Sequence, residues 1–108
     1  MIARVWEGLV PAKKSNAYRD YLAGFGIADY KRIAGNLGGA LLRGDDGAVS
    51  RFLFLSYWTT RAALKTYAGP EYQKPHYYAY DLECLLDPID TVQHYEVVAS
   101  WTHPIEPK

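Results

Sequence analysis

The sequence has little sulfur chemistry, because it contains a single cysteine, Cys84, among 108 residues. One thiol cannot form an internal disulfide, and a cysteine-based zinc site needs several thiolates. Histidine is also scarce, with three residues in the chain. We therefore expect no disulfide framework and no metal site.

Net charge is absent as well, since 12 basic residues balance 12 acidic ones. Without a basic stripe to neutralise phosphates, nucleic acid is not an expected partner. No apolar run is long enough to span a membrane, and Arg4 and Glu7 interrupt any signal-peptide core near the N-terminus. The sequence predicts a cytoplasmic protein with no membrane partner.

Aromatic side chains, in contrast, are abundant: ten Tyr, three Trp and three Phe make up 15% of the chain. Tyr and Trp combine a large apolar body with a polar tip, which suits both pockets and interfaces. Two interpretations remain open, a Tyr-rich core and dimer face or an aromatic-lined cavity. The length predicts one domain over residues 1–99, followed by a C-terminal tail over 100–108.

Apolar periodicity predicts the order of helices and strands. Alternating β-branched and aromatic residues indicate strands, whereas Tyr18, Tyr21 and Leu22 recur at helical spacing. The predicted elements are a strand over 2–10, a helix over 12–23, a short helical turn over 27–33, a Gly-rich approach and strand over 35–43, and a hairpin turn at 44–47. They continue with a strand over 49–58, a helix capped by Thr59 or Thr60, a helical stretch over 71–85 in which Pro75 introduces a kink or starts a new segment, and a strand over 91–99.

The resulting βαββαβ order predicts an α+β, ferredoxin-like fold. Right-handed crossovers give one antiparallel sheet in the order 4-1-3-2 with its helices on one face. The strand over 49–58 is apolar on both sides, with Phe52 and Phe54 on one face and Leu53 and Leu55 on the other. The face without helices must be buried by something, and a second copy of the sheet is the simplest cover. We therefore expect a homodimer in which two sheets form a dimeric α+β barrel.

Three segments resemble the antibiotic biosynthesis monooxygenase (ABM) superfamily. They are Met1-Ile2-Ala3-Arg4-Val5-Trp6-Glu7-Gly8, Leu41-Leu42-Arg43 with the acidic turn and Phe52-Leu53-Phe54-Leu55-Ser56-Tyr57-Trp58, and Val92-Gln93-His94-Tyr95-Glu96-Val97-Val98. The resemblance covers residues 1–99 and implies a dimeric α+β barrel with a ligand cavity between each sheet and its helices. The superfamily includes cofactor-independent monooxygenases acting on polycyclic phenols and haem-degrading monooxygenases, so the fold alone does not identify a reaction.

The sequence departs from the haem-degrading branch of this superfamily. That branch is known for an Asn in its first strand and for a Trp and a His associated with the helix and pocket. Here no Asn lies between Ile2 and Val10, no Trp lies between Thr59 and Asp90, and His76 matches the axial His by location only. Haem degradation is therefore a less favoured hypothesis of function.

His76, His94 and Arg4 are the candidate catalytic residues. An imidazole can accept a proton near neutral pH, and His94 lies on a strand that should pair with the strand carrying Arg4. In this reading a histidine deprotonates a substrate and Arg4 stabilises the resulting anion. Structural alternatives are a surface histidine beside a kink for His76 and a polar cross-strand cluster for His94.

The candidate substrate-binding residues are Trp6, Trp58, Tyr67, Tyr72 and Glu96. The quinone-forming ABM branch uses Trp, Tyr, Asn and Arg around an aromatic substrate, and the chain offers several residues of these types. Trp58 can instead belong to the core, and the tyrosines between 67 and 80 can form an interface stripe.

Two hypotheses of function follow. The first is a cofactor-independent monooxygenase that oxidises an aromatic or phenolic small molecule with O₂. The second is a non-enzymatic ligand-binding or stress-response dimer of the same fold.

Overall fold

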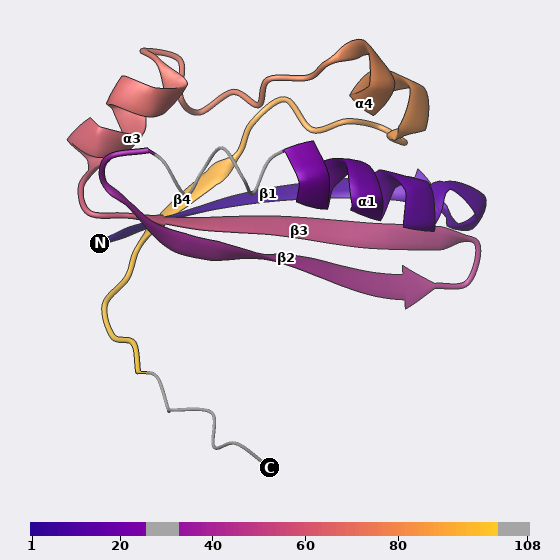
Figure 1. The fold of residues 1–108 in the computed structure, drawn as a ribbon, viewed down its shortest axis with the longest axis horizontal. Helices are drawn as coiled ribbons and strands as arrows, with labels where there is room; N and C mark the ends of the chain where they lie inside the picture. The colour runs from indigo at the N-terminus through magenta and orange to yellow at the C-terminus, as the bar shows by residue number, and fades with distance from the viewer. Residues whose placement is uncertain (26–32, 102–108) are drawn as a thin grey trace.

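The computed structural model describes residues 1–25 and 33–101 (Figure 1). Its elements are β1 (Ile2–Pro11), η1 (Ala12–Lys14), α1 (Ser15–Phe25), β2 (Asn36–Asp46), β3 (Val49–Trp58), α3 (Arg61–Ala68), α4 (Ala79–Cys84) and β4 (Gln93–Glu96). The strands form one antiparallel sheet in the order β2-β3-β1-β4, which confirms the predicted ferredoxin-like order 4-1-3-2.

The register of β1 and β3 decides which side chains reach the helices. Arg4 pairs with Ser56 and Trp6 pairs with Phe54, and all four point to the helix-covered face because side chains alternate along a strand. His94 of β4 pairs with Arg4 from the other side. The predicted neighbourhood of Arg4 and His94 is therefore confirmed.

The hairpin between β2 and β3 turns later than predicted. The first strand was expected to stop at Arg43, but β2 continues to Asp46 and the turn lies at Gly47 and Ala48. Gly47 has a φ of 62°, which glycine adopts without a Cβ penalty. Residues 44–46 therefore extend the pairing of β2 with β3, and Gly47 forms the turn.

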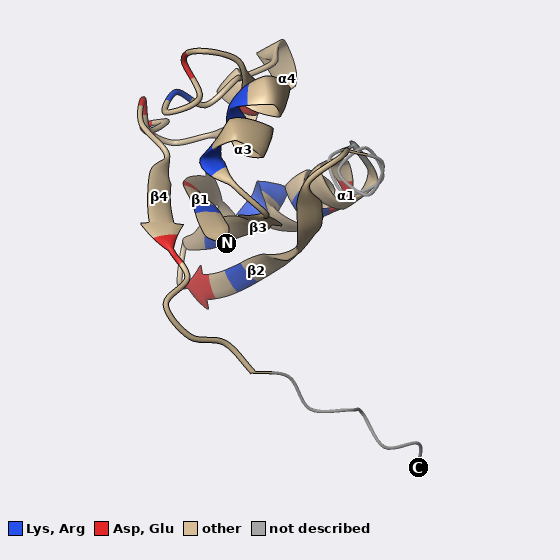
Figure 2. Ribbon diagram, turned by 90° about the vertical axis from the view of Figure 1, so that its left-hand side faces the viewer, with Lys and Arg blue, Asp and Glu red and all other residues tan. Residues whose placement is uncertain are grey.

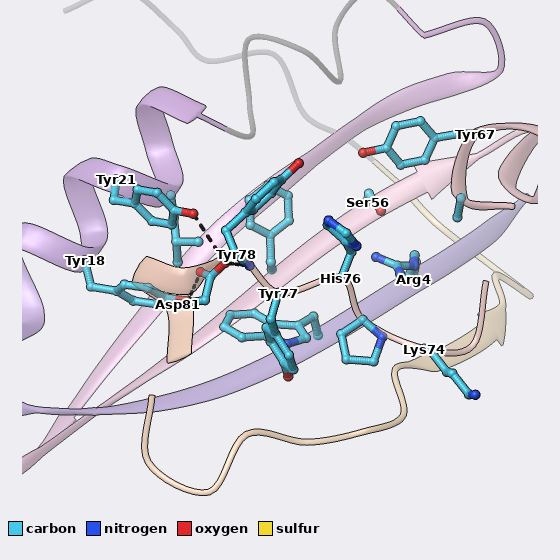
Figure 3. Close-up of a pocket in the computed structure, with 15 residues that line it drawn as sticks. Arg4, Tyr18, Tyr21, Ser56, Tyr67, Lys74, His76, Tyr77, Tyr78 and Asp81 are labelled. Carbon is cyan, nitrogen blue, oxygen red and sulfur yellow. Dashed lines mark hydrogen bonds between the residues drawn. The ribbon is translucent and has the colours of Figure 1, made fainter. Parts of the chain in front are cut away.

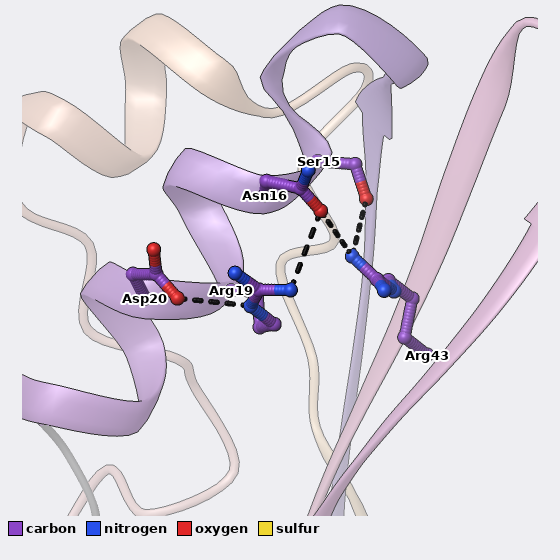
Figure 4. Close-up of polar contacts among 5 residues, drawn as sticks. All are labelled: Ser15, Asn16, Arg19, Asp20 and Arg43. Atoms are coloured by element: carbon purple, nitrogen blue, oxygen red, sulfur yellow. Dashed lines mark hydrogen bonds and ion pairs between the residues drawn. The ribbon is translucent and has the colours of Figure 1, made fainter.

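Helix α1 is tied to the sheet by a polar clamp (Figure 4). Nη1 of Arg43 on β2 donates to Oδ1 of Asn16 at 2.8 Å and to Oγ of Ser15 at 3.3 Å. Arg19 donates to the same Asn16 oxygen at 3.4 Å and pairs with Asp20 at 2.9 Å. These contacts fix the start of α1 over the β2 edge and so position Tyr18 one turn further on.

The predicted helix over 71–85 is wrong over most of its length. Only α4, Ala79–Cys84, is helical, and the residues before it form turns and extended chain. Pro75 has no backbone N–H and disfavours helix at Lys74, while Gly69 ends α3 with a φ of 87°. The segment 70–78 therefore crosses above the sheet without regular structure.

The last strand is also shorter than predicted, since β4 spans Gln93–Glu96 and not 91–99. The N–H of Val92 does not bond to a strand but donates to the carbonyl of Gln73 at 2.7 Å. At the other end Val97 makes one further bond, to the carbonyl of Met1 at 2.9 Å. The predicted helical turn over 27–33 and most of the tail fall outside the described residues.

A single core joins the sheet to α1 and α4. Its buried members are Trp6, Val10, Tyr18, Phe52, Cys84, Leu85 and Val92. Rings of Tyr18 and Phe52 meet edge to face at 5.6 Å between centroids. Burial of Cys84 agrees with a small apolar filler in this core.

The helices α1, α3 and α4 lie on one side of the sheet, and no helix among the described residues covers the other side, which we call the bare side (Figure 1). Lys and Arg, and likewise Asp and Glu, are spread over strands and helices (Figure 2). No helix among the described residues is long and apolar enough to cross a membrane.

Candidate functional site

A pocket of about 410 Å³ lies between the helix-facing side of the sheet and the chain from Tyr67 to Asp81 (Figure 3). This volume falls within the range of small-molecule sites, about 300–1,000 Å³. The floor comes from β1 and β3, and α1 contributes Tyr18 and Tyr21 from one side. The irregular segment 70–78 forms part of the wall, so the departure from helix shapes the pocket.

Arg4 projects from β1 into this pocket. Its Nη2 donates to the carbonyl of Tyr72 at 3.5 Å, and its buried Nε has no partner among the described residues. None of the ion pairs among the described residues includes Arg4. Lys74 adds a second cation to the lining, although it also pairs with Glu71 at 3.4 Å.

Asp81 carries the acidic group of the lining and is 6% exposed. Tyr18 donates its hydroxyl to Oδ1 at 2.8 Å, while Tyr21 and the Tyr78 N–H donate to Oδ2 at 3.3 Å and 2.9 Å. Burial, followed by the contact with Asp81, raises the pKa of the Tyr18 hydroxyl well above its ordinary value. The same two causes raise the pKa of Tyr21 to about 12, so both phenols stay protonated and donate.

The two candidate histidines occupy different environments. His76 lies on the pocket lining, is exposed, and meets the ring of Tyr78 edge to face at 4.8 Å. His94 does not line the pocket; its Nε2 is buried without a partner among the described residues, and its ring meets Tyr72 at 5.1 Å. Burial, followed by the charge of Arg4, lowers the pKa of His94 to about 4, which makes it a weak proton acceptor.

Trp6 forms part of the pocket floor and is held in place by Tyr77. The Trp6 indole N–H donates to the Tyr77 oxygen at 3.0 Å, and the Tyr77 hydroxyl donates to the carbonyl of Ile89 at 2.6 Å. Their rings meet edge to face at 6.4 Å. This chain of bonds presents a fixed aromatic surface to a ligand.

The remaining predicted substrate-binding residues divide between pocket and core. Tyr67 lines the pocket and stacks on Trp58 at 5.2 Å. Trp58 is completely buried and donates to Oγ of Ser56 at 2.9 Å, so it supports Tyr67 from the core. The carbonyl of Tyr72 accepts a hydrogen bond from Arg4, and its ring meets the ring of His94 edge to face. Glu96 is exposed and pairs with Ile2, outside the pocket lining.

Sequence reasoning missed the acidic side of the pocket. Tyr18 and Tyr21 were recognised as one helix face, but the position of Asp81 against them was not predicted. The available signal was the start of α4 at Ala79, since Asp81 lies three positions after Tyr78 and an acidic residue there can accept its N–H. Among the described residues, no group of three or more His, Cys, Asp or Glu side chains is arranged to hold a metal ion.

Comparison with solved structures identifies the fold. A Bacillus cereus protein provisionally described as an antibiotic biosynthesis monooxygenase superposes with a TM-score of 0.65 at 16% identity, covering 94% of this chain and 97% of that one. A similarly described protein from Nitrosomonas europaea gives 0.65 at 17% identity, over 92% of this chain and 100% of that one. The haem degrader MhuD from Mycobacterium tuberculosis, solved with two haems in its active site, gives 0.62 at 21%, over 94% and 100%.

No protein-family model matches the sequence, and no curated protein matches it. At these identities the structural likeness establishes the fold, which is ABM-like over nearly the whole chain. The predicted resemblance is thereby confirmed at the level of the fold.

Proposed function

We propose that this protein is a cofactor-independent monooxygenase that oxidises an aromatic, phenolic small molecule with O₂. The observation that carries the proposal is Arg4, a cation inside an aromatic pocket whose Nε has no partner among the described residues. An electron-rich phenol reacts with O₂ as its anion. The protein must therefore stabilise that anion, hold the ring and exclude water.

Each part of this task has a candidate residue. Arg4 binds the oxyanion, and Trp6 with Tyr77 holds the aromatic ring. His76, the imidazole on the pocket lining, accepts the substrate proton. His94 is the poorer base because its pKa is about 4, so we assign it a packing role beside Arg4.

The reaction balances without an added reductant. In a substrate such as an anthrone, the methylene is conjugated through the rings with a carbonyl group, and proton loss gives a carbanion delocalised onto the carbonyl oxygen. The carbanion carbon forms a bond to O₂, the second C–H bond and the O–O bond then break, one oxygen becomes a carbonyl, and the other leaves as water with the two protons. The overall change is R₂CH₂ + O₂ → R₂C=O + H₂O, and the substrate supplies all the electrons.

Oxygen uptake with 1,8-dihydroxy-9-anthrone as the probe tests the proposal. We expect saturable uptake above the autoxidation rate, and we expect Arg4→Met to lower kcat/KM about 100-fold, the usual effect of losing an oxyanion donor. Lys13→Met is the control, because Lys13 on η1 is an exposed cation that lies outside the pocket lining and the proposed dimer face. Uptake that is equal in wild type and Arg4→Met, or that never exceeds autoxidation, contradicts the proposal.

Histidine substitutions refine the assignment of the base. His76→Gln should lower kcat, whereas His94→Gln should leave kcat largely unchanged. Full activity in a variant lacking both imidazoles would remove histidine from the mechanism.

The alternative is a ligand-binding dimer without catalysis, which the same pocket would serve. Saturable binding of the anthrone with no oxygen uptake would favour it. Haem is a further ligand to test because a structural neighbour binds it and His76 offers an imidazole on the lining. A Soret shift that disappears in His76→Ala would favour haem over the phenolic substrate.

We further propose that the protein forms a homodimer through the bare side of the sheet. Side chains on this face include Val5, Leu53, Leu55 and Tyr57, all of them only half-buried, and Leu42, which is 45% exposed. An apolar face of this kind, which here also carries the Glu7–Arg51 ion pair, is typical of an interface. Leu55→Glu should give a monomer in analytical ultracentrifugation. Leu82→Glu on exposed α4 should not, and a monomeric wild type contradicts the dimer.

A further inference from the structure

The pocket is chemically polarised, and this polarity identifies a class of ligand. We propose that the pocket selects a fused-ring aromatic anion with polar groups at both ends. Its anionic oxygen binds Arg4, and a hydroxyl group at the far end of the ring system donates a hydrogen bond to Asp81. This inference rests on the proposed function, because it names the substrate class of the same pocket. It adds the assignment of Asp81 as the residue that determines specificity and orientation.

The two polar ends are well separated along the sheet. Arg4 pairs with Ser56 of β3, whereas Tyr18, which donates to Asp81, packs on Phe52 of the same strand. Four residues of a strand span about 13 Å, so the two ends suit groups at opposite edges of a fused-ring system. Figure 3 shows Arg4 and Lys74 on one side of the pocket and Asp81 with Tyr18 and Tyr21 on the other.

The Arg4 end is built for an anionic acceptor. A guanidinium has five N–H donors, and among the described residues those of Arg4 make one hydrogen bond, to the carbonyl of Tyr72 at the long distance of 3.5 Å. Its Nε is buried and lacks a partner among the described residues, although buried polar atoms are almost always satisfied. A carboxylate or phenolate oxygen supplies the missing acceptor, and no acidic side chain in the described ion pairs competes for it.

The Asp81 end has the opposite preference. A carboxylate has about four acceptor positions. Three donors reach Asp81 from the described residues, and the Tyr21 hydroxyl is the most distant of them at 3.3 Å. No Lys or Arg forms an ion pair with Asp81 among the described residues. This end therefore repels an anion and accepts a hydrogen bond from a ligand hydroxyl group. That bond forms either at the remaining acceptor position of the carboxylate or in place of the bond from Tyr21.

The wall between the two ends is aromatic, with Trp6, Phe54 and Tyr77 on the lining. Aromatic walls bind flat rings without fixing their direction, because a ring can be turned end for end with little loss of contact. Orientation must therefore come from the few polar groups of the pocket. A cation at one end and a carboxylate at the other fix it in a single direction.

Binding under anaerobic conditions tests the inference separately from turnover. The probes are 6-hydroxy-2-naphthoate, which has both groups, 6-methoxy-2-naphthoate, which cannot donate, and 2-naphthol, which lacks the carboxylate. We expect the hydroxy acid to bind wild-type protein about tenfold or more tightly than either of the others by isothermal titration calorimetry, since both lost bonds involve a charged group. Equal affinities, or no saturable binding of the hydroxy acid, overturn the inference.

Variants assign each preference to its residue. Arg4→Met should abolish the advantage of the hydroxy acid over 2-naphthol and keep its advantage over the methoxy acid. Asp81→Asn should do the reverse, and Lys13→Met should change neither. A reversed pattern overturns the orientation. If Asp81→Asn fails to fold in a thermal melt, the wild-type comparison of hydroxy and methoxy probes still decides the matter.

Readmission of oxygen separates this inference from the proposed function. Selective binding without oxygen uptake refutes the monooxygenase and leaves the ligand class standing. Anthrone turnover without the selectivity of the naphthoate series supports the monooxygenase and overturns the ligand class.

Discussion

Removal of one hydroxyl group from Tyr18 should destabilise the protein measurably. Tyr18 is fully buried and donates to the buried Asp81 at 2.8 Å, while its ring packs on Phe52. Tyr18→Phe keeps the ring and deletes only the donor. A buried hydrogen bond to a charged group contributes about 1.5–3 kcal/mol, so we expect the free energy of unfolding to fall by that amount.

Tyr21→Phe is the matched control, since it removes a hydroxyl from the same helix and the same carboxylate. Its bond is longer, 3.3 Å, and Tyr21 is only half-buried, so the expected loss is about 1 kcal/mol or less. Urea unfolding followed by tryptophan fluorescence gives both values by linear extrapolation.

Equal losses in the two variants would refute this reasoning, as would a loss below about 0.5 kcal/mol for Tyr18→Phe. A double-mutant cycle with Asp81→Asn isolates the pairwise contribution. If Tyr18 acts through Asp81, the loss from Tyr18→Phe should shrink in the Asp81→Asn background. An unchanged loss would mean that the hydroxyl group acts elsewhere.

Three further predictions follow from other contacts. Gly39→Ala should strongly destabilise β2 in thermal melts, because its Cβ would overlap the Leu55 carbonyl, whereas Gly44→Ala on the same strand meets nothing and should be neutral or stabilising. The pKa of His94 falls from 6.5 to about 4 on folding, so its neutral form contributes stability above pH 6.5 that is lost as the pH falls toward 4. His94→Gln should flatten urea stability against pH in that window, and an unchanged slope contradicts the assignment. Thr60→Ala removes the hydroxyl that caps the Ala63 N–H of α3 and should lower the free energy of unfolding in urea by about 1 kcal/mol. An unchanged free energy of unfolding would contradict a stabilising role for this cap.

Local patterns predicted the sheet well because its strands are rich in β-branched and aromatic residues and are bounded by Pro, Gly and Asp. The sequence placed the strands of Arg4 and His94 side by side, but the register that pairs these two residues comes from the structure. Helix ends and turns were less predictable, since the choice between Gly44 and Gly47 for the hairpin depends on how far β2 and β3 continue to pair. The pocket contacts of Asp81 arise from packing between α1 and α4, which local sequence does not encode.

The missing helix over 71–78 explains both the pocket and the state of Arg4. In a continuous helix the carbonyls of Tyr72 and Gln73 would accept N–H groups four residues later. With Pro75 in place the chain forms turns and irregular backbone, and these carbonyls bond instead to the Arg4 guanidinium at 3.5 Å and the Val92 N–H at 2.7 Å. The loss of this helix thus connects the segment to both β1 and the approach to β4. The carbonyl of Tyr72 accepts from Nη2 of Arg4 and leaves the buried Nε without a partner among the described residues.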